Sequence, residues 1–286
     1  MKLFSYLIFL KLTLAMAVAQ AAPSVATPAQ SKSAGSVYKQ DQTESNIAWL
    51  VAKILERSHY SQQAMNDEIS GKFFDRYFEI LDGQHFYFLQ SDIAEFEPYR
   101  TKLDDLTKVS GNTKPAHLIF ARLMERVDQR VAYVNKLLKT GKFDFTGNDR
   151  YTPNRKDQPR PKNLEDAKKL WRQGLRFEFL QEKLALSDTN KVHEAKEKLK
   201  SPTKGSDSVS TNAVAKKTQT PTEIIIQKIT KRYATVERNL KELSDDDVFE
   251  IYITALARVY DPHSDYMGKS QFENFNISMK LSLFGI

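Results

Sequence analysis

Cysteine is absent from this chain of 286 residues. Its absence excludes a disulfide framework, a thiolate nucleophile, and zinc or iron–sulfur centres held by cysteine. Glycine and proline occur only 10 times each, which argues against a collagen-like chain or a glycine-rich all-β chain. Because 41% of the residues are hydrophobic and 11% aromatic, the chain is too apolar to be wholly disordered. Its length suits one large domain or two small ones.

Motifs of several common protein classes are missing as well. We find no ribonucleoprotein, zinc-finger or basic-zipper pattern, and no GxSxG, Walker or dinucleotide-binding motif. Lys and Arg number 43 against 36 Asp and Glu, a formal net charge of +7. An excess of this size permits contact with acidic surfaces but does not establish nucleic-acid binding. We therefore expect no nucleic-acid partner and no cofactor.

The N-terminus has the features of a secretory signal peptide. The chain begins with the positively charged segment Met1-Lys2. A mostly apolar stretch over residues 3–18 follows, and then Ala19-Gln20-Ala21, an A-x-A cleavage site. An uncleaved membrane anchor is the alternative, but the apolar stretch is short and Lys11 interrupts it. We therefore expect residues 1–21 to be removed on export and residues 22–40 to form a flexible tether. No later run is apolar enough to predict a stable membrane span.

Apolar residues recur at helical spacing through residues 41–268, which predicts a mainly α domain. Asp41 with Glu44 is expected to cap the first helix. Pro115 suits the first turn of a long helix that ends at Gly141. Further helices are expected after caps at Ser91 and Ser244, and at about 164–186 and 223–243.

Two segments depart from this pattern. Residues 187–222 contain no aromatic residue and are rich in Lys, Ser and Thr, so we expect a disordered insert between two helices.

The second segment lies at the C-terminal end, where Ser270 with Glu273 predicts the start of a short helix. Apolar and polar residues then alternate from Ile277 to Leu283, and this period of two predicts a β-strand. The expected fold is a helical domain that ends in a single strand.

Three side chains of metal-binding type lie close together in the sequence: Asp261, His263 and Asp265. A metal site and a capped turn are the two interpretations. We favour the turn, because three ligands on one short turn rarely close a coordination shell and no HExxH or EF-hand spacing accompanies them. We therefore expect no resident metal.

A serine-hydrolase motif pair also occurs. Ser201 and Lys204 fit the S-x-x-K pattern, and Lys139-Thr140-Gly141 fits the K-T-G pattern, of penicillin-recognising serine enzymes. Their order in the chain is reversed, and Ser201 lies in the expected disordered insert. We therefore do not expect an unrelated hydrolase that uses this pair.

Two further features have a structural and a functional interpretation. Aromatic residues gather between Tyr77 and Phe88, where a core stripe is favoured over a binding groove because such stripes are usually buried. Five basic residues lie within residues 150–162. A solvated loop is favoured there over contact with anionic lipid or an acidic partner.

Several motifs, taken together and in order, resemble the N-terminal region of the tail-specific proteases. These are the periplasmic C-terminal-processing serine peptidases of Gram-negative bacteria. The resemblance covers roughly residues 45–286. The motifs include Phe74-Asp75-Arg76-Tyr77, Leu89-Gln90-Ser91-Asp92-Ile93, residues 144–149 and Asp261-Pro262-His263-Ser264, and residues 279–286 look like the start of the family's PDZ domain.

The resemblance implies a helical N-terminal domain over residues 41–268, and residues 269–286 that lead into a PDZ domain absent from this chain. Asp261, Pro262, His263 and Ser264 are the expected joint to that domain. The family's Ser/Lys dyad lies beyond the PDZ domain, so the resemblance implies no catalytic residue here and a chain that is inactive alone.

The resemblance also implies partners and a location. The partners are the PDZ and protease domains of the same protein, protein substrates with apolar C-termini, and a lipoprotein adaptor, all in the periplasm. A free-standing periplasmic helical module that binds a partner is the alternative to part of a protease.

Overall fold

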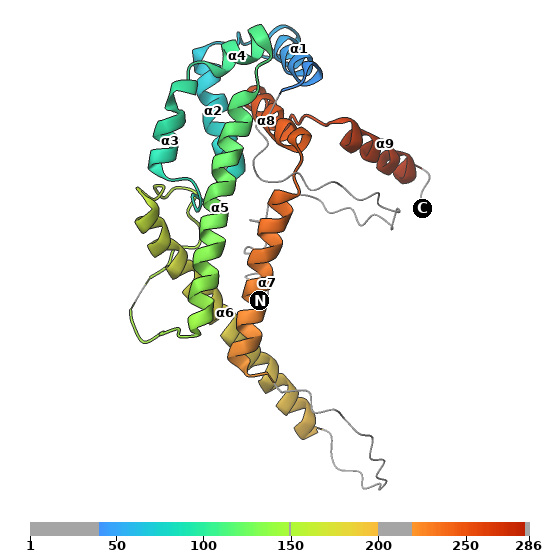
Figure 1. The fold of residues 1–286 in the computed structure, drawn as a ribbon. Helices are drawn as coiled ribbons and strands as arrows, with labels where there is room; N and C mark the ends of the chain where they lie inside the picture. Colours follow the sequence, from blue (N-terminus) through green and yellow to red (C-terminus); the bar gives the residue numbers. More distant parts are fainter. Residues whose placement is uncertain (1–39, 149, 200–218, 284–286) are drawn as a thin grey trace. The chain divides into compact units, whose positions relative to one another are not determined.

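The computed structural model describes residues 40–148, 150–199 and 219–283. Over these ranges the chain forms nine α-helices and one short 3₁₀ helix, with no β-strand, which confirms the mainly α prediction (Figure 1). None of these helices is both long enough and apolar enough to cross a membrane. The helices are α1 (Gln42–Ser58), α2 (Asp67–Asp82), α3 (Gln90–Phe96), η1 (Glu97–Tyr99), α4 (Leu103–Ser110), α5 (Lys114–Thr140), α6 (Leu164–Leu199), α7 (Pro221–Lys241), α8 (Asp245–Tyr260) and α9 (Lys269–Leu283).

The core is built where α2 packs against α8. The ring of Tyr252 on α8 lies 4.5 Å from that of Phe73 and 5.1 Å from that of Tyr77, both on α2. The buried hydroxyl of Tyr77 donates to the carbonyl of Ala116 at 3.0 Å, which ties α2 to the start of α5. These aromatic residues are core, as the helical spacing predicts.

The long helix α5 joins this core to a second group of helices. Along its length it packs against α6, α7 and α8, and α6 and α7 also pack against each other (Figure 1). One apolar stripe of α5 is buried, and it consists of Ile119, Leu123, Val127, Val131, Val134 and Leu138.

Most helix ends follow the sequence signals. The Asp41 carboxylate accepts the N–H of Glu44 at 2.7 Å and caps α1. Ser244 caps α8 in a capping box with Asp247. Gly141 follows α5 with φ of +60°, a conformation that glycine adopts without strain. The helix predicted from Ser91, however, begins at Gln90, because the Asp92 carboxylate accepts the N–H of Leu89 at 2.8 Å.

The predicted disordered insert over residues 187–222 is wrong at both ends. Helix α6 continues to Leu199, and α7 begins at Pro221. Residues 187–199 contain no Pro or Gly and include several Lys, Glu and Ala residues. Lys, Glu and Ala have high intrinsic helix propensity, which favours continuation of α6 through this segment. Residues 200–218 lie outside the described part, as do the predicted signal peptide 1–21 and tether residues 22–39.

The predicted strand from Ile277 to Leu283 is also wrong, because this segment is the second half of α9. A strand needs a neighbour to pair with its backbone, and the described residues contain none, whereas a helix satisfies these groups internally. The alternating pattern spreads the apolar side chains around the helix. Ile277 is therefore 56% exposed and Met279 48% exposed. Residues 284–286 lie outside the described part.

Candidate functional site

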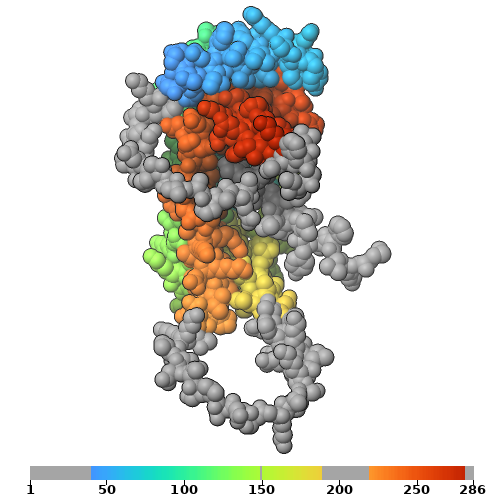
Figure 2. Space-filling view, turned by 90° about the vertical axis from the view of Figure 1, so that its right-hand side faces the viewer, coloured from blue at the N-terminus to red at the C-terminus, as the bar shows by residue number. Residues whose placement is uncertain are grey.

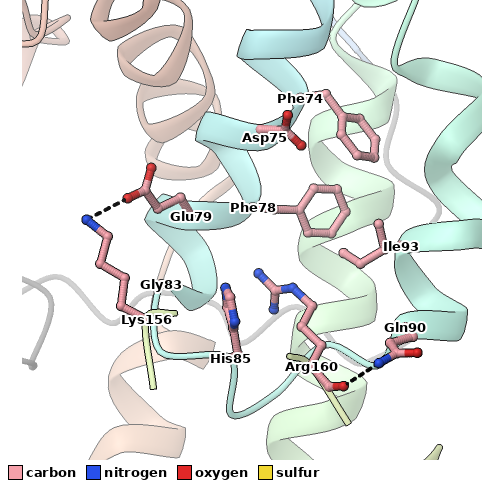
Figure 3. Close-up of a pocket in the computed structure, with 10 residues that line it drawn as sticks. All are labelled: Phe74, Asp75, Phe78, Glu79, Gly83, His85, Gln90, Ile93, Lys156 and Arg160. Carbon is pink, nitrogen blue, oxygen red and sulfur yellow. Dashed lines mark hydrogen bonds and ion pairs between the residues drawn. The ribbon is translucent and has the colours of Figure 1, made fainter. Parts of the chain in front are cut away.

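A pocket of about 480 Å³ opens between α2, α3 and the loop that contains residues 156–160 (Figure 3). Phe74 and Phe78 of α2 and Ile93 of α3 form its apolar side. His85, Gln90, Lys156 and Arg160 supply polar groups, and Asp75 and Glu79 lie on the α2 side. The pocket thus joins an apolar wall to a rim of mixed charge.

Asp82, the last residue of α2, organises one end of this pocket. Its carboxylate accepts backbone N–H groups from Phe86 at 2.8 Å, Tyr87 at 3.1 Å and Phe88 at 3.0 Å. It also accepts Arg160 Nη1 at 2.6 Å. One buried carboxylate therefore shapes the chain after α2 and anchors the loop across the pocket.

His85 lines the pocket in a left-handed backbone conformation, with φ of +55°. This conformation is uncommon for a residue with a side chain. The ring Nδ1 lies 2.6 Å from the carbonyl of Gln158. Because a carbonyl only accepts, Nδ1 carries the proton in this contact. The neighbouring Gln84 side chain accepts the N–H of Arg155 at 2.8 Å, so both residues hold the same loop.

The basic residues of this loop are largely used within the chain. Arg160 binds Asp82, and Lys156 pairs with Glu79 at 3.5 Å. Burial lowers the pKa of both Arg155 and Arg160. The prediction of a solvated loop therefore describes only part of this segment, because the side chains of Lys156 and Arg160 fasten the loop to α2.

The chemistry of the pocket suits binding more than covalent catalysis. No Ser, Thr or Cys is among its described lining residues, so they offer no hydroxyl or thiol nucleophile. Its carboxylates are already paired, Asp75 with Arg100 at 2.8 Å and Glu79 with Lys156. The arrangement can accept an apolar group against Phe74 and Phe78, with polar contacts at the rim.

The predicted joint lies directly after α8. Asp261 is the C-terminal cap that follows α8, and its carboxylate accepts the N–H of His263 at 3.3 Å and the hydroxyl of Ser264 at 3.2 Å. The N–H of His263 is the main cause that lowers the pKa of Asp261. Asp265 pairs instead with Arg258 at 2.7 Å. This is the geometry of a capped turn, and within the described ranges no three His, Asp or Glu side chains are placed to share a metal ion.

The two hydrolase-like motifs are not brought together in the described part. Lys139, Thr140 and Gly141 lie at the C-terminal end of α5. Ser201 and Lys204 fall outside the described residues.

Comparison with known proteins decides the family. Residues 51–270 match the family model described as "Tail specific protease N-terminal domain". The chain belongs to this family. It is also 33% identical over 233 residues to the tail-specific protease of Haemophilus influenzae, in a match that covers 81% of this chain. The match spans only 28% of the length of that relative.

The family assignment confirms the resemblance derived from the motifs. The pocket at Asp82 and the turn from Asp261 to Ser264 both lie within the tail-specific protease N-terminal domain, whose match ends at residue 270. The features described above therefore lie within the residues that match the family model, whereas most of α9 lies beyond them.

Sequence reasoning missed a second ionic cluster in this domain. Asp92 of α3 is 1% exposed and accepts Arg122 Nη1 at 2.8 Å and Arg126 Nη2 at 2.6 Å, both from α5. Burial by itself raises the pKa of Asp92, but the bonds from Arg126, the Leu89 N–H and Arg122 outweigh it and lower the pKa. No local signal predicts this cluster, because its members come from different helices.

A third cluster surrounds Arg130, which is buried on α5. Its Nη2 donates to the hydroxyl of Tyr233 on α7 at 3.2 Å, and that hydroxyl donates to Glu178 of α6 at 2.9 Å. The guanidinium also lies 4.9 Å from the ring of Phe86 and 5.1 Å from that of Tyr87. The signal for this site was present, because Arg130 interrupts the apolar stripe of α5.

Proposed function

We propose that this chain forms the helical N-terminal scaffold of a periplasmic tail-specific serine protease that degrades or processes envelope proteins from their C-termini. The observation that supports this proposal most strongly is the family match over residues 51–270. The named relative is a tail-specific protease of which the match spans 28%. In this proposal the chain supplies no catalytic residue, and the Ser/Lys dyad belongs to the remainder of the protease.

The ionic clusters support a scaffolding role. Asp82 fastens the basic loop to α2, Asp92 fastens α3 to α5, and Arg130 joins α5 to α7. Such contacts fix the helices in one arrangement because each buried charge has few alternative partners. A domain of fixed shape is what a scaffold for the PDZ and protease domains requires.

Exposed apolar side chains support the presence of partners. On α1, Trp49 is 44% exposed, and Leu50 and Ile54 are each 50% exposed. On α9, Phe272 and Phe275 are also exposed. Both helices reach the surface on the face drawn in Figure 2, α1 in blue and α9 in red. Apolar groups gathered at a surface favour contact with other protein surfaces. The proposed partners are the PDZ and protease domains, a lipoprotein adaptor and substrates with apolar C-termini.

The turn from Asp261 to Ser264 is the proposed joint to the PDZ domain. Pro262 restricts its backbone, and the side chain of Asp261 closes it through His263 and Ser264. The turn therefore defines the direction in which the chain leaves α8.

A peptidase assay tests the proposal. The purified 286-residue chain is incubated with an unstructured reporter that ends in apolar residues, and the proposal predicts no cleavage. The Ser201→Ala variant is the matched control for the S-x-x-K motif. Cleavage by the chain that disappears in this variant would show that the chain is itself a hydrolase.

The periplasmic location has its own test. Removal of residues 1–21 is expected to move the protein from the periplasmic to the cytoplasmic fraction. Cell fractionation of the full-length and shortened chains measures this change. An unchanged distribution would contradict the export signal.

A further inference from the structure

The charges that line the pocket of Figure 3 balance one another. Among its described lining residues two are acidic, Asp75 and Glu79, and two are basic, Lys156 and Arg160. Each of these four side chains already lies in an ion pair. An ionic ligand would therefore have to displace a charge that is already paired, at the cost of its own desolvation. The pocket suits a neutral ligand.

The α2 side of the pocket is a preformed aromatic wall. The buried rings of Phe74 and Phe78 lie 4.8 Å apart, and the ring of Phe78 also lies 4.8 Å from that of Phe88. Ile93 of α3 adds a branched apolar side chain. Such a wall can pack against a further aromatic ring in an offset or edge-to-face arrangement. The volume of about 480 Å³ lies within the usual range for ligand pockets, about 300–1,000 Å³.

His85 presents an unused hydrogen-bond acceptor to this pocket. Its Nδ1 donates to the carbonyl of Gln158 at 2.6 Å, so in the neutral ring Nε2 carries the free lone pair. Within the described ranges no group donates a hydrogen bond to this nitrogen. Figure 3 shows the His85 ring and the guanidinium of Arg160 facing one another at one end of the pocket.

Arg160 supplies unused donors at the same end of the pocket. A guanidinium carries five N–H groups. Nη1 donates to the Asp82 carboxylate at 2.6 Å and Nη2 to the Asp82 carbonyl at 3.3 Å, and these are its hydrogen bonds in the part of the chain that the structure describes. The contact with Asp82 thus holds the guanidinium in place and leaves other N–H groups for a ligand.

We propose that this pocket binds a phenol ring, such as the side chain of a tyrosine. The ring packs against Phe74 and Phe78, and its hydroxyl donates to His85 Nε2 and accepts an N–H of Arg160. A hydroxyl both donates and accepts, whereas an indole N–H only donates and a carboxylate only accepts. The phenol is therefore the neutral aromatic side chain that matches both unused groups. The inference does not depend on the function proposed above.

The test compares two probes that differ only in the hydroxyl. Binding of N-acetyl-tyrosinamide and of N-acetyl-phenylalaninamide to the 286-residue chain is measured by isothermal titration calorimetry and by saturation-transfer NMR. The tyrosine probe is expected to bind at least about fivefold more tightly, which corresponds to about 1 kcal/mol, the usual net contribution of one hydrogen bond. This comparison uses the unchanged chain, so it does not depend on the folding of a variant.

His85→Asn locates the acceptor. The asparagine amide can donate to the Gln158 carbonyl in place of Nδ1, and asparagine tolerates a positive φ. The variant lacks Nε2, so binding of the tyrosine probe should weaken at least about threefold, whereas binding of the phenylalanine probe should hardly change. His263→Asn is the matched control, because the His263 side chain is 91% exposed and does not line the pocket.

Ile93→Ala tests the wall separately from the hydroxyl. It removes apolar contact area from both probes, so both should bind more weakly by a similar factor. Circular dichroism of each variant establishes that its helices are intact.

Equal binding of the two probes to the unchanged chain, or binding of neither, would overturn the proposal. A preference for tyrosine that survives in His85→Asn, or that is lost to the same degree in His263→Asn, would overturn it as well. Two further probes distinguish the sources of a phenol. A glycine peptide with one central tyrosine that binds as tightly as N-acetyl-tyrosinamide indicates a polypeptide side chain. A peptide that binds much more weakly than p-cresol indicates a small free phenol.

Discussion

Arg160 Nη1 lies 2.6 Å from Asp82 Oδ2, although the two residues are 78 positions apart in the sequence. The contact places the end of α2 beside a loop that precedes α6. Because the same carboxylate also accepts three backbone N–H groups, Asp82 is the point on which the pocket of Figure 3 depends.

Asp82→Ala is expected to lower the free energy of unfolding by about 3–5 kcal/mol, because it leaves a buried guanidinium and three N–H groups without their acceptor. Urea unfolding followed by circular dichroism measures the change. Asp75→Ala is the control, since Asp75 is 65% exposed in its pair with Arg100 and such pairs contribute about 1 kcal/mol or less. Equal losses in the two variants would contradict the role assigned to Asp82.

Asp92 is expected to make stability depend on pH. Its pKa in the folded chain is lowered from the ordinary value of 3.8, since the bonds from Arg126, the Leu89 N–H and Arg122 outweigh burial. A carboxyl group with a lowered folded pKa stabilises the fold above its unfolded pKa, and this contribution is lost as the pH falls through the folded pKa. The wild type should therefore lose stability steeply below about pH 4, and Asp92→Asn less steeply.

Urea unfolding at a series of pH values measures this difference. Glu95→Gln is the control, because Glu95 shares Arg122 but is 54% exposed. Parallel pH profiles for the wild type and Asp92→Asn would show that the Asp92 cluster does not contribute in this way.

Gly111 and Gly141 have the same backbone conformation, so substituting each by alanine separates the cost of backbone strain from the cost of a steric clash. Gly111 has φ of +61° and Gly141 has φ of +60°. A Cβ at Gly111 would lie 2.0 Å from the carbonyl oxygen of Ser45, whereas at Gly141 the nearest atom, on Ile226, is 3.9 Å away. Gly141→Ala is expected to cost about 1–2 kcal/mol from the left-handed conformation alone.

Gly111→Ala should cost clearly more, because α1 and α4 must also move apart. Thermal unfolding of the two variants measures the difference. Similar melting temperatures would contradict the close approach of Ser45 to Gly111.

Arg130 is expected to respond differently to two substitutions. Arg130→Ala removes the contacts to Tyr233, Phe86 and Tyr87 and leaves a cavity, with an expected loss of about 3–5 kcal/mol. Arg130→Met should cost less, because methionine fills the volume and also removes the buried Nε, which has no partner in the described part. Denaturant unfolding distinguishes the two, and equal losses would show that volume does not matter at this position.

Helix positions were predictable from local signals. The stripe of α5, the cap at Asp41 and the glycine at 141 all act within a few residues of the chain. The apolar period and the cap chemistry therefore specify these elements without knowledge of their neighbours.

The predictions that failed concern features that depend on more than the local apolar period and cap residues. From Ile277 to Leu283 the alternation indicates a strand, but a strand depends on a partner, and the described part contains no strand to pair with. Residues 187–199 contain no aromatic residue, yet their intrinsic helix propensity continues α6. The site at Asp82 was missed because Arg160 approaches it only after the chain has folded.

The most direct test of the central claim is the intact mass of the native protein. The protein is recovered from the source cells with an antibody against residues 45–140, and its mass is measured without proteolysis. The account predicts a species far heavier than the 32.9 kDa of this chain, with the protease domains in the same polypeptide. A species slightly lighter than 32.9 kDa, by one signal peptide, would contradict the account and indicate a free-standing helical module that binds a partner.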